Sequence, residues 1–209
     1  MFKMSPFWEK IFFIATFITQ GSSFLNPSSY GLLHRKHHKY SDTAKDPHSP
    51  LFFNNFFSFM LKTFKEYRKL TSDILKNKNK NYNLPRLEFI EKLGELMITR
   101  IVFSLIYILF YWYNANSFWY FLLIPIHIFM GPIHGFIVNW FGHKKGYRNY
   151  NKLSDNSKNT LPIDILMMGE LYQNNHHNSP QKAKFSDRWF EIDIAYFFII
   201  IFKKLKIVY

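Results

Sequence analysis

Apolar and polar stretches alternate along this chain, and their lengths predict helices rather than strands. Residues 7–33 are mostly apolar but carry scattered charged and amide side chains, which predicts an interfacial helix rather than a cleaved signal peptide. The aromatic segment 51–64 is amphipathic in the same way. Residues 65–96 are polar and charged, and we expect them to form helix and loop at an aqueous surface.

Two more strongly apolar segments follow, at 98–113 and 118–140. The second is long enough to cross a bilayer, and the first becomes so if its neighbours join it. Basic residues flank the outer ends of the pair, whereas the short link between them carries none. The positive-inside rule therefore predicts a transmembrane hairpin over 97–140 with both ends in the cytoplasm. Residues 141–190 would form a cytosolic cap, and the apolar C-terminal segment would return to the membrane surface.

Composition narrows the possible chemistry. The chain has no cysteine, which excludes disulfides, zinc–thiolate sites, iron–sulfur clusters and cysteine nucleophiles. A metal would have to be held by nitrogen and oxygen. The net charge of +13 fits either nucleic acid or anionic lipid as a partner. No nucleic-acid-binding module is visible, so we expect a lipid bilayer and no nucleic acid.

Polar side chains rich in histidine form two clusters of the same spacing, with an Asn/His pair between them in sequence, all on the predicted cytosolic side. Polar side chains at i, i+3 and i+4 lie along one face of a helix. Neutral imidazole is a common ligand of zinc, copper and iron, but six imidazoles exceed what one zinc site uses. A pair of irons beside a bilayer favours oxygen chemistry on a lipid. The side chains are His34, His37 and His38; Asn139 and His143; and Gln173, His176 and His177.

Four segments carry a family resemblance: "HRKHHKYSDTAKDPHSP", "GPIHGFIVNWFGHKKGYRNY", "DNSKNTLP" and "GELYQNNHHNSP". They resemble the histidine boxes and linking segments of membrane fatty acid desaturases, most closely the bacterial and stearoyl-CoA delta-9 type. The resemblance implies a non-haem di-iron oxidoreductase with two ferrous ions. Such an enzyme uses dioxygen and two electrons to introduce a cis double bond, delta-9 in this group, into a saturated fatty acyl chain.

The resemblance also implies a setting for the enzyme. The expected fold is an all-α integral membrane protein, in which a transmembrane helical hairpin and interfacial helices carry a cytosolic His-rich di-metal domain. One domain would cover residues 1–209. The protein would be multi-pass, in a bacterial inner membrane with the boxes cytoplasmic. An external donor, such as a ferredoxin, a cytochrome or a flavin reductase, would supply electrons.

Site residues follow from the resemblance by position. Asn139 matches a residue that contacts iron through water. Gln173 stands where many relatives carry histidine, and would be a weak ligand or lie behind the ligands. The direct iron ligands would be His34, His37 and His38 of the second box, His143 after the last span, and His176 and His177 of the third box.

Most of the other polar residues near these motifs have two possible roles. Asp42, Asp46 and Glu170 could accept the second N–H of a ligating imidazole, or Asp42 and Asp46 could simply cap a helix end. Arg148 and Lys144 could meet the phosphate of an acyl carrier or a lipid head group, or they could be an ordinary basic flank.

Four further residues are expected to stay outside the metal site. His127 and His134 lie within the second span, and helix packing is the expected role for both. His48 follows a proline and could be a ligand, but a turn is its expected setting. Glu191, in the segment "WFEID", matches a recurring family segment without a chemical role.

The chain departs from the family at its start. The family begins with another transmembrane hairpin and a first box of the form HxxxxH, but no histidine precedes His34. A mis-assigned start codon or a gene fragment would explain this, and the sequence as it stands predicts a defective iron site and little activity. The alternatives are a lipid or alkane hydroxylase and an N-terminally truncated, non-catalytic remnant. The acyl carrier (CoA, carrier protein or phospholipid), the chain length and the oligomeric state stay open.

Overall fold

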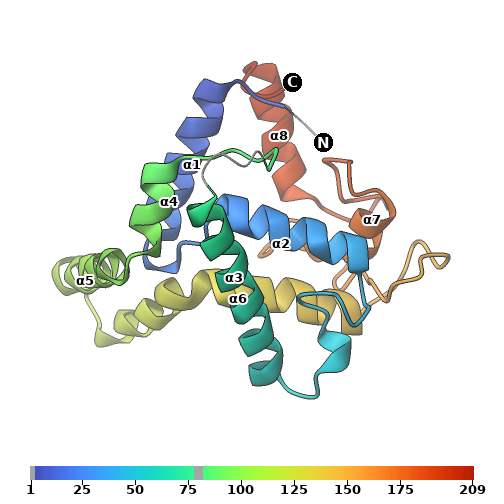
Figure 1. Cartoon of the computed structure of the whole chain (residues 1–209), viewed down its shortest axis with the longest axis horizontal. Coiled ribbons are helices and arrows are strands. Elements are labelled where there is room, and N and C mark those ends of the chain that lie inside the picture. Colours follow the sequence, from blue (N-terminus) through green and yellow to red (C-terminus); the bar gives the residue numbers. More distant parts are fainter. Residues whose placement is uncertain (1–2, 78–81) are drawn as a thin grey trace. The chain divides into compact units, whose positions relative to one another are not determined.

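A computed structural model describes residues 3–77 and 82–209, and these residues are mostly helical (Figure 1). Within them β structure is limited to isolated bridges, such as the one between Tyr147 and Asn159. The all-α prediction is confirmed. The helices are α1 (Pro6–Gln20), α2 (Pro27–Tyr40), α3 (Phe56–Lys76), α4 (Glu88–Glu95), α5 (Met97–Asn114), α6 (Leu123–Lys144), α7 (Gln173–Asn178) and α8 (Ile194–Lys204), with the 3-10 helices η1 (Gly21–Ser23), η2 (Pro50–Phe52) and η3 (Phe118–Leu122).

The chain divides into two compact units. The first contains Met1–Trp8, His34–Lys65 and His134–Tyr209, and the second contains Glu9–Leu33 and Glu66–Ile133. Helices α1, α2, α3 and α6 each begin in one unit and end in the other. All the histidines of the predicted metal site belong to the first unit. A single domain over the whole chain stays a prediction.

The predicted interfacial helix over 7–33 is interrupted in the structure. Helix α1 ends at Gln20, and α2 begins only at Pro27. Gly21 has a φ of 53°, a left-handed conformation that a side chain disfavours, and a Cβ there would overlap the Tyr107 hydroxyl. Proline is well placed at the first position of a helix, where its missing N–H costs nothing. Glycine and proline therefore break a segment that hydrophobicity alone makes continuous.

Aromatic packing holds the second unit together. Phe17 makes edge-to-face contacts with Phe24 and Phe103, with ring centroids 5.4 and 5.5 Å apart. Beside this core, the fully buried Glu91 pairs with Arg86 at 2.8 Å. A buried carboxylate needs such a partner, because an isolated charge would be costly there.

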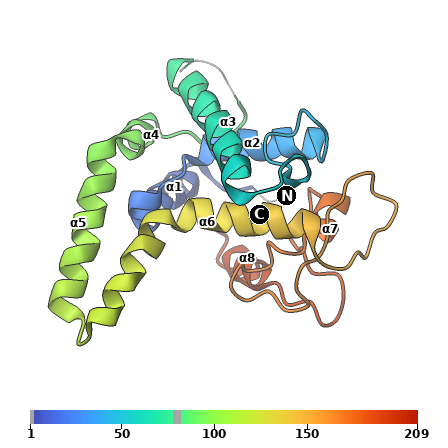
Figure 2. The same ribbon diagram turned by 90° about the horizontal axis from the view of Figure 1, so that it is seen from below.

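Two apolar helical segments, Met97–Asn114 and Phe118–Lys144, are long enough to cross a membrane. Figure 2 shows α5 and the first half of α6 side by side as a hairpin. The Tyr111 hydroxyl lies 2.8 Å from Nε2 of His127, which confirms the packing role expected for this histidine. Many apolar side chains of α5 are exposed, as suits a helix against lipid: Ile101, Val102, Leu105, Ile106, Leu109 and Phe110.

Two glycines provide a matched test of this packing. Gly94 on α4 faces the ring of Phe24 so closely that a methyl group would overlap it, whereas Gly135 on α6 faces open space. Gly94→Ala should lower the free energy of unfolding by about 2 kcal/mol through overpacking. Gly135→Ala should raise it by roughly 0.5 kcal/mol, since alanine favours the helix. Thermal unfolding in detergent measures both, and equal shifts in the two variants would contradict the packing.

Candidate metal centre

Helix α2 carries three histidines, but it does not direct them to one place. His34 and His38 are one turn apart, and their Nε2 atoms are 3.0 Å from each other. His37 lies between them in sequence and is buried. Successive residues on a helix point about 100° apart, so the ring of His37 leaves the helix in a different direction.

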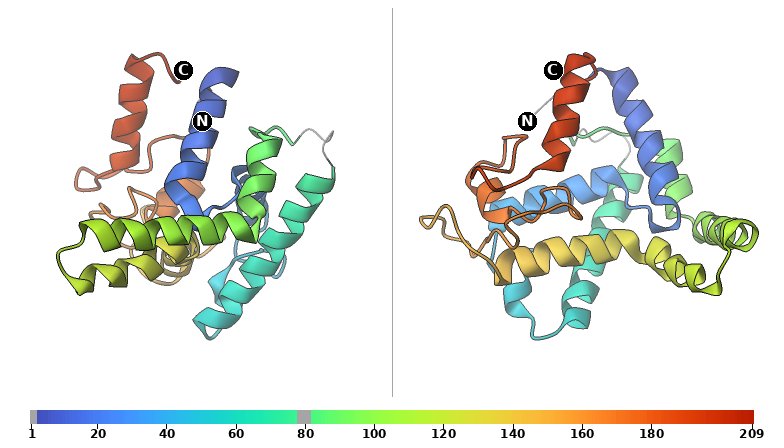
Figure 3. Two further views of the ribbon diagram at one scale, coloured as in Figure 1. Left: turned by 90° about the vertical axis from the view of Figure 1, so that its left-hand side faces the viewer. Right: turned by 180° about the vertical axis from the view of Figure 1, so that it is seen from behind.

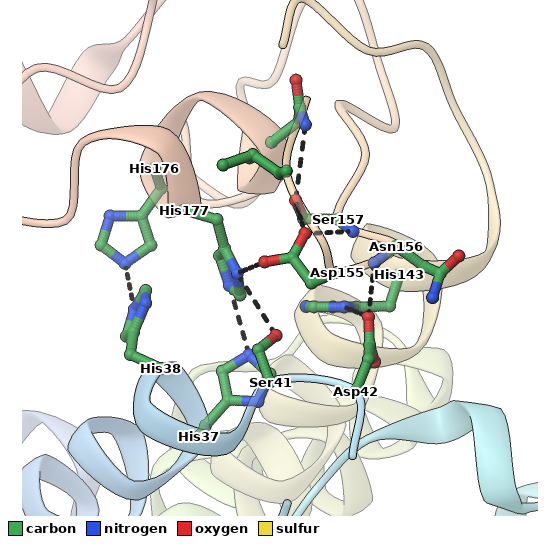
Figure 4. A network of polar contacts seen from close by, with 12 residues as sticks. His37, His38, Ser41, Asp42, His143, Asp155, Asn156, Ser157, His176 and His177 are labelled. Atoms are coloured by element: carbon green, nitrogen blue, oxygen red, sulfur yellow. Dashed lines mark hydrogen bonds and ion pairs between the residues drawn. The ribbon is translucent and has the colours of Figure 1, made fainter. Parts of the chain in front are cut away.

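Helix α7 divides its two histidines in the same way. Nε2 of His176 lies 3.2 Å from Nε2 of His34 and 2.8 Å from Nε2 of His38. The neighbouring His177 turns instead to His37, with 3.2 Å between their Nε2 atoms. Adjacent residues of α7 thus serve two separate groups of imidazoles (Figure 4).

Each group is completed as a triplet within the first unit. The first triplet is His34, His38 and His176, and the second is His37, His143 and His177. In each triplet the potential ligand atoms lie within 4.8 Å of one another. His143 comes from the end of α6, and its ring centroid is 5.0 Å from that of His37 and 4.9 Å from that of His177. The two predicted clusters therefore meet.

The donor atoms of both triplets fit a metal cation. In the first triplet three Nε2 atoms face one another at 2.8–3.2 Å, although a neutral imidazole has only one N–H to donate. A metal about 2.1 Å from each nitrogen would set neighbouring nitrogens roughly 3 Å apart at right angles. In the second triplet, Nε2 of His143 is buried and has no hydrogen-bond partner among the described residues. A cation would satisfy these nitrogens.

A carboxylate orients each of the three rings of the second triplet, and Figure 4 shows the ones beside His143 and His177. His37 donates from Nδ1 to Asp46 at 2.9 Å, His143 to Asp42 at 2.9 Å, and His177 to Asp155 at 2.7 Å. A proton fixed on Nδ1 leaves the Nε2 lone pair free for a metal, and the carboxylate makes that nitrogen more basic. The predicted contacts of Asp42 and Asp46 with imidazoles are present in the structure.

The electrostatics favour the neutral form of His34 and His38. Burial, and then the charge of His177, lowers the pKa of His34 to about 4. Burial and the neighbouring His34 lower the pKa of His38 to about 3. Burial alone would raise the pKa of Asp155, but hydrogen bonds from His177 and Ser157 lower it well below its usual value. At neutral pH His34 and His38 are therefore neutral imidazoles, and Asp155 is an ionised carboxylate.

Helix α7 has only six residues and is too short to be stable alone. Its first N–H groups are capped from outside, because Oδ1 of Asn159 accepts from Asn174 N at 3.1 Å and from Asn175 N at 3.3 Å. Nδ2 of Asn175 donates to Oε2 of the buried Glu191 at 2.8 Å. These buried groups hold His176 and His177 in place.

Glu191 is the centre of this amide network. Its Oε1 accepts from the Tyr147 hydroxyl at 2.7 Å and from Nδ2 of Asn149 at 2.8 Å. Its Oε2 also accepts from the N–H of Arg188 at 2.9 Å. The sequence motif around Glu191 gave it no role, and the structure gives it one: it anchors the segment that carries the third cluster.

The two predicted amides each donate a hydrogen bond to a backbone carbonyl in the described chain. Nδ2 of Asn139 donates to the Gly135 carbonyl at 2.8 Å, and Nε2 of Gln173 donates to the Glu170 carbonyl at 2.7 Å. Gln173 also packs against Gly142, where a Cβ would overlap its side chain. A role for either amide toward a metal stays a prediction.

Other predicted residues have different partners in the structure. The Glu170 carboxylate makes no hydrogen bond to a histidine in the described chain; burial, with Asp193 and Asp164 nearby, raises its pKa to about 7. Nη2 of Arg148 donates to the Leu153 carbonyl at 3.2 Å, and Nζ of Lys144 donates to the Phe53 carbonyl at 3.1 Å.

Two residues near the site were not assigned to it from sequence. Asp155 belongs to the quoted segment "DNSKNTLP", but no spacing rule links it to His177. His48 lies in a bend, as expected for a turn, yet it is buried and its ring centroid is 4.5 Å from that of His37. With His37 and Asp46 it forms a third group that could hold a metal, but Asp46 already accepts from His37.

Comparison with known proteins gives consistent results. The family described as "Fatty acid desaturase" matches residues 3–193. A probable chloroplastic lipid desaturase of Arabidopsis thaliana is 32% identical over 78% of this chain and 43% of its own. An acyl-CoA Δ11 desaturase of Choristoneura rosaceana is 30% identical over 74% and 46%. An sn-1 stearoyl-lipid 9-desaturase of Synechocystis is 28% identical over 91% and 57%. The chain spans about half the length of these relatives, and no solved structure matches.

The carboxylate behind His177 can be tested by one substitution. Asp155→Asn keeps the shape but removes the charge that orients the ring, so the affinity for Co²⁺ or Fe²⁺ should fall by about 10–100-fold. Asp187→Asn is the matched control, because Asp187 is exposed. In the described chain its carboxylate accepts a hydrogen bond only from the Tyr150 hydroxyl, and its backbone N–H donates to Glu191. Metal titration followed by absorption measures both. Unchanged affinity in Asp155→Asn, or an equal loss in the control, would contradict this role.

Proposed function

Because the chain belongs to the fatty acid desaturase family, we propose that its two histidine triplets hold two ferrous ions and that it desaturates a fatty acyl chain. The observation that carries the proposal is the convergence of α2, α6 and α7 on two groups of imidazoles whose ring nitrogens face one another. Copper or zinc would suit the same nitrogens, but the reaction of the family requires an oxidant derived from dioxygen.

The proposed ligands divide by triplet, with three imidazole nitrogens for each iron. Asn139 would reach an iron through water, and Gln173 would be a weak ligand or support one. Asp42, Asp46 and Asp155 would hold the Nδ1 protons of the second triplet. The ligands are His34, His38 and His176 for one ion, and His37, His143 and His177 for the other.

The iron pair would supply the oxidising power that removes two hydrogens from adjacent, unactivated methylene carbons. Overall, one dioxygen, two electrons and two protons are consumed for each double bond, and two waters form. The task of the protein is positional: it fixes the rings through carboxylates and the amide network, and keeps bulk water from buried nitrogens. An external protein would donate the electrons.

The substrate would be a saturated fatty acyl chain in a membrane setting. The names of the relatives include both lipid-linked and CoA-linked acyl chains, so they support the acyl group and leave its carrier open. A delta-9 position follows the 9-desaturase relative. Lys92 lies before the apolar hairpin, Arg100 lies near its start, and Lys144 and Lys145 follow it. These basic residues support a cytoplasmic side for both ends of the hairpin.

Product analysis tests this proposal. Membranes containing the protein, supplied with iron, dioxygen, an electron donor and a deuterated stearoyl substrate, should yield the cis-9 alkene by mass spectrometry. His38→Ala should reduce the product at least about 100-fold by removing a ligand. Lys65→Ala, an exposed change on α3, should leave it unchanged.

Other products would decide against desaturation. An alcohol in place of the alkene would identify a hydroxylase, and no product from a fully iron-loaded protein would favour the non-catalytic remnant. The same experiment also gives the iron concentration needed for half-maximal product. This concentration tests whether the iron site is defective, as the sequence predicts.

A further inference from the structure

A cavity of about 420 Å³ lies in the first unit, between the loop that follows α7 and helix α8. Figure 3 shows this loop leading into α8, the red helix near the C-terminus. One wall of the cavity is a stripe of α8 with the i, i+3, i+4, i+7 spacing of a single helix face. The stripe consists of Tyr196, Ile199, Ile200 and Lys203.

The lining of this cavity is cationic on one part and apolar on another. Lys182 and Lys184 from the loop join Lys203, and no Asp or Glu side chain is among the described residues that line the cavity. In the described chain, none of these three ammonium groups has a hydrogen-bond or ion-pair partner. Ile199 and Ile200 supply an apolar wall. Such a lining suits a molecule with an anionic head and a hydrocarbon tail.

We propose that this cavity binds the phosphate head group of an anionic phospholipid, with the first methylenes of its acyl chain along Ile199 and Ile200. The outer face of α8 supports a lipid as the occupant. Phe197 is 60% exposed and Phe198 is 43% exposed, and lysines follow at the end of the helix. A short helix with these features lies in the membrane interface, where phospholipid head groups are the most abundant anions.

The cavity is connected to the first triplet through Phe185. This residue follows Lys184, and its ring centroid is 4.3 Å from that of His176. Its backbone N–H donates at 2.6 Å to Asp193, which caps the start of α8 by accepting from Tyr196 N at 2.8 Å. A bound head group would therefore hold the loop after the metal-binding helix at the membrane surface. The binding site is independent of the proposed reaction.

Native mass spectrometry of the full chain in a nonionic detergent tests this site. With equal amounts of phosphatidylglycerol and phosphatidylcholine of the same acyl chains, one phosphatidylglycerol should be retained with about tenfold preference. Lys184→Ala combined with Lys203→Ala should weaken its binding by about 25-fold, roughly fivefold for each lysine. Lys152→Ala, an exposed lysine that does not line the cavity, should have no effect.

A second variant tests the apolar wall without changing charge. Ile200→Ser should weaken phosphatidylglycerol binding several-fold, whereas a diffuse attraction to the net positive protein would be unaffected. Equal retention of the two lipids would overturn the proposal, as would an equal loss in Lys152→Ala. Displacement of the lipid by millimolar inorganic phosphate would also overturn it, because the site would then take a soluble anion.

Discussion

Six imidazoles that face one another, four of them buried, are the interaction on which this structure depends. Burial of a polar group is costly unless the group is hydrogen-bonded or bound to a metal. Here Nε2 of His143 and Nδ1 of His176 are buried without partners in the described chain. The arrangement is therefore best explained as a site built for cations, and the surrounding carboxylates and amides are what keep it in place.

The two triplets are not supported equally. The second has a carboxylate on Nδ1 of each of its rings, provided by Asp42, Asp46 and Asp155. In the first triplet, Nδ1 of His176 has no such partner, and its ring packs against Phe185 instead. A carboxylate increases the basicity of the opposite ring nitrogen, so the two ions would have different electronic surroundings. This asymmetry is present in the protein without any bound metal, because it depends on which ring nitrogens hydrogen-bond to acidic side chains.

Much of the site could be predicted from sequence, because helical spacing is a local property. The i, i+3, i+4 pattern placed His34, His37 and His38 on a helix, and α2 contains them. The pattern did not show that His37 would separate from its neighbours, since that depends on where α7 and His143 lie. Asp155 and Glu191 also act through contacts between residues distant in sequence, 22 residues apart for Asp155 and His177. Gly21 and Pro27 are residues that commonly end or begin helices, but the hydrophobic pattern continues across both of them and predicted one unbroken helix. Glu170 is close in sequence to His177, but in the described chain its carboxylate makes no hydrogen bond to an imidazole, so its role stays a prediction.

The central claim is that α2 and α7 each divide their histidines between two metal ions. Counting bound ferrous ions by Mössbauer spectroscopy of the iron-57 protein tests it most directly, with His37→Ala and His38→Ala compared side by side. The account predicts two spectroscopically distinct ions in the parent protein. His38→Ala should remove one of them and His37→Ala the other. Loss of the same signal in both variants would contradict two separate triplets.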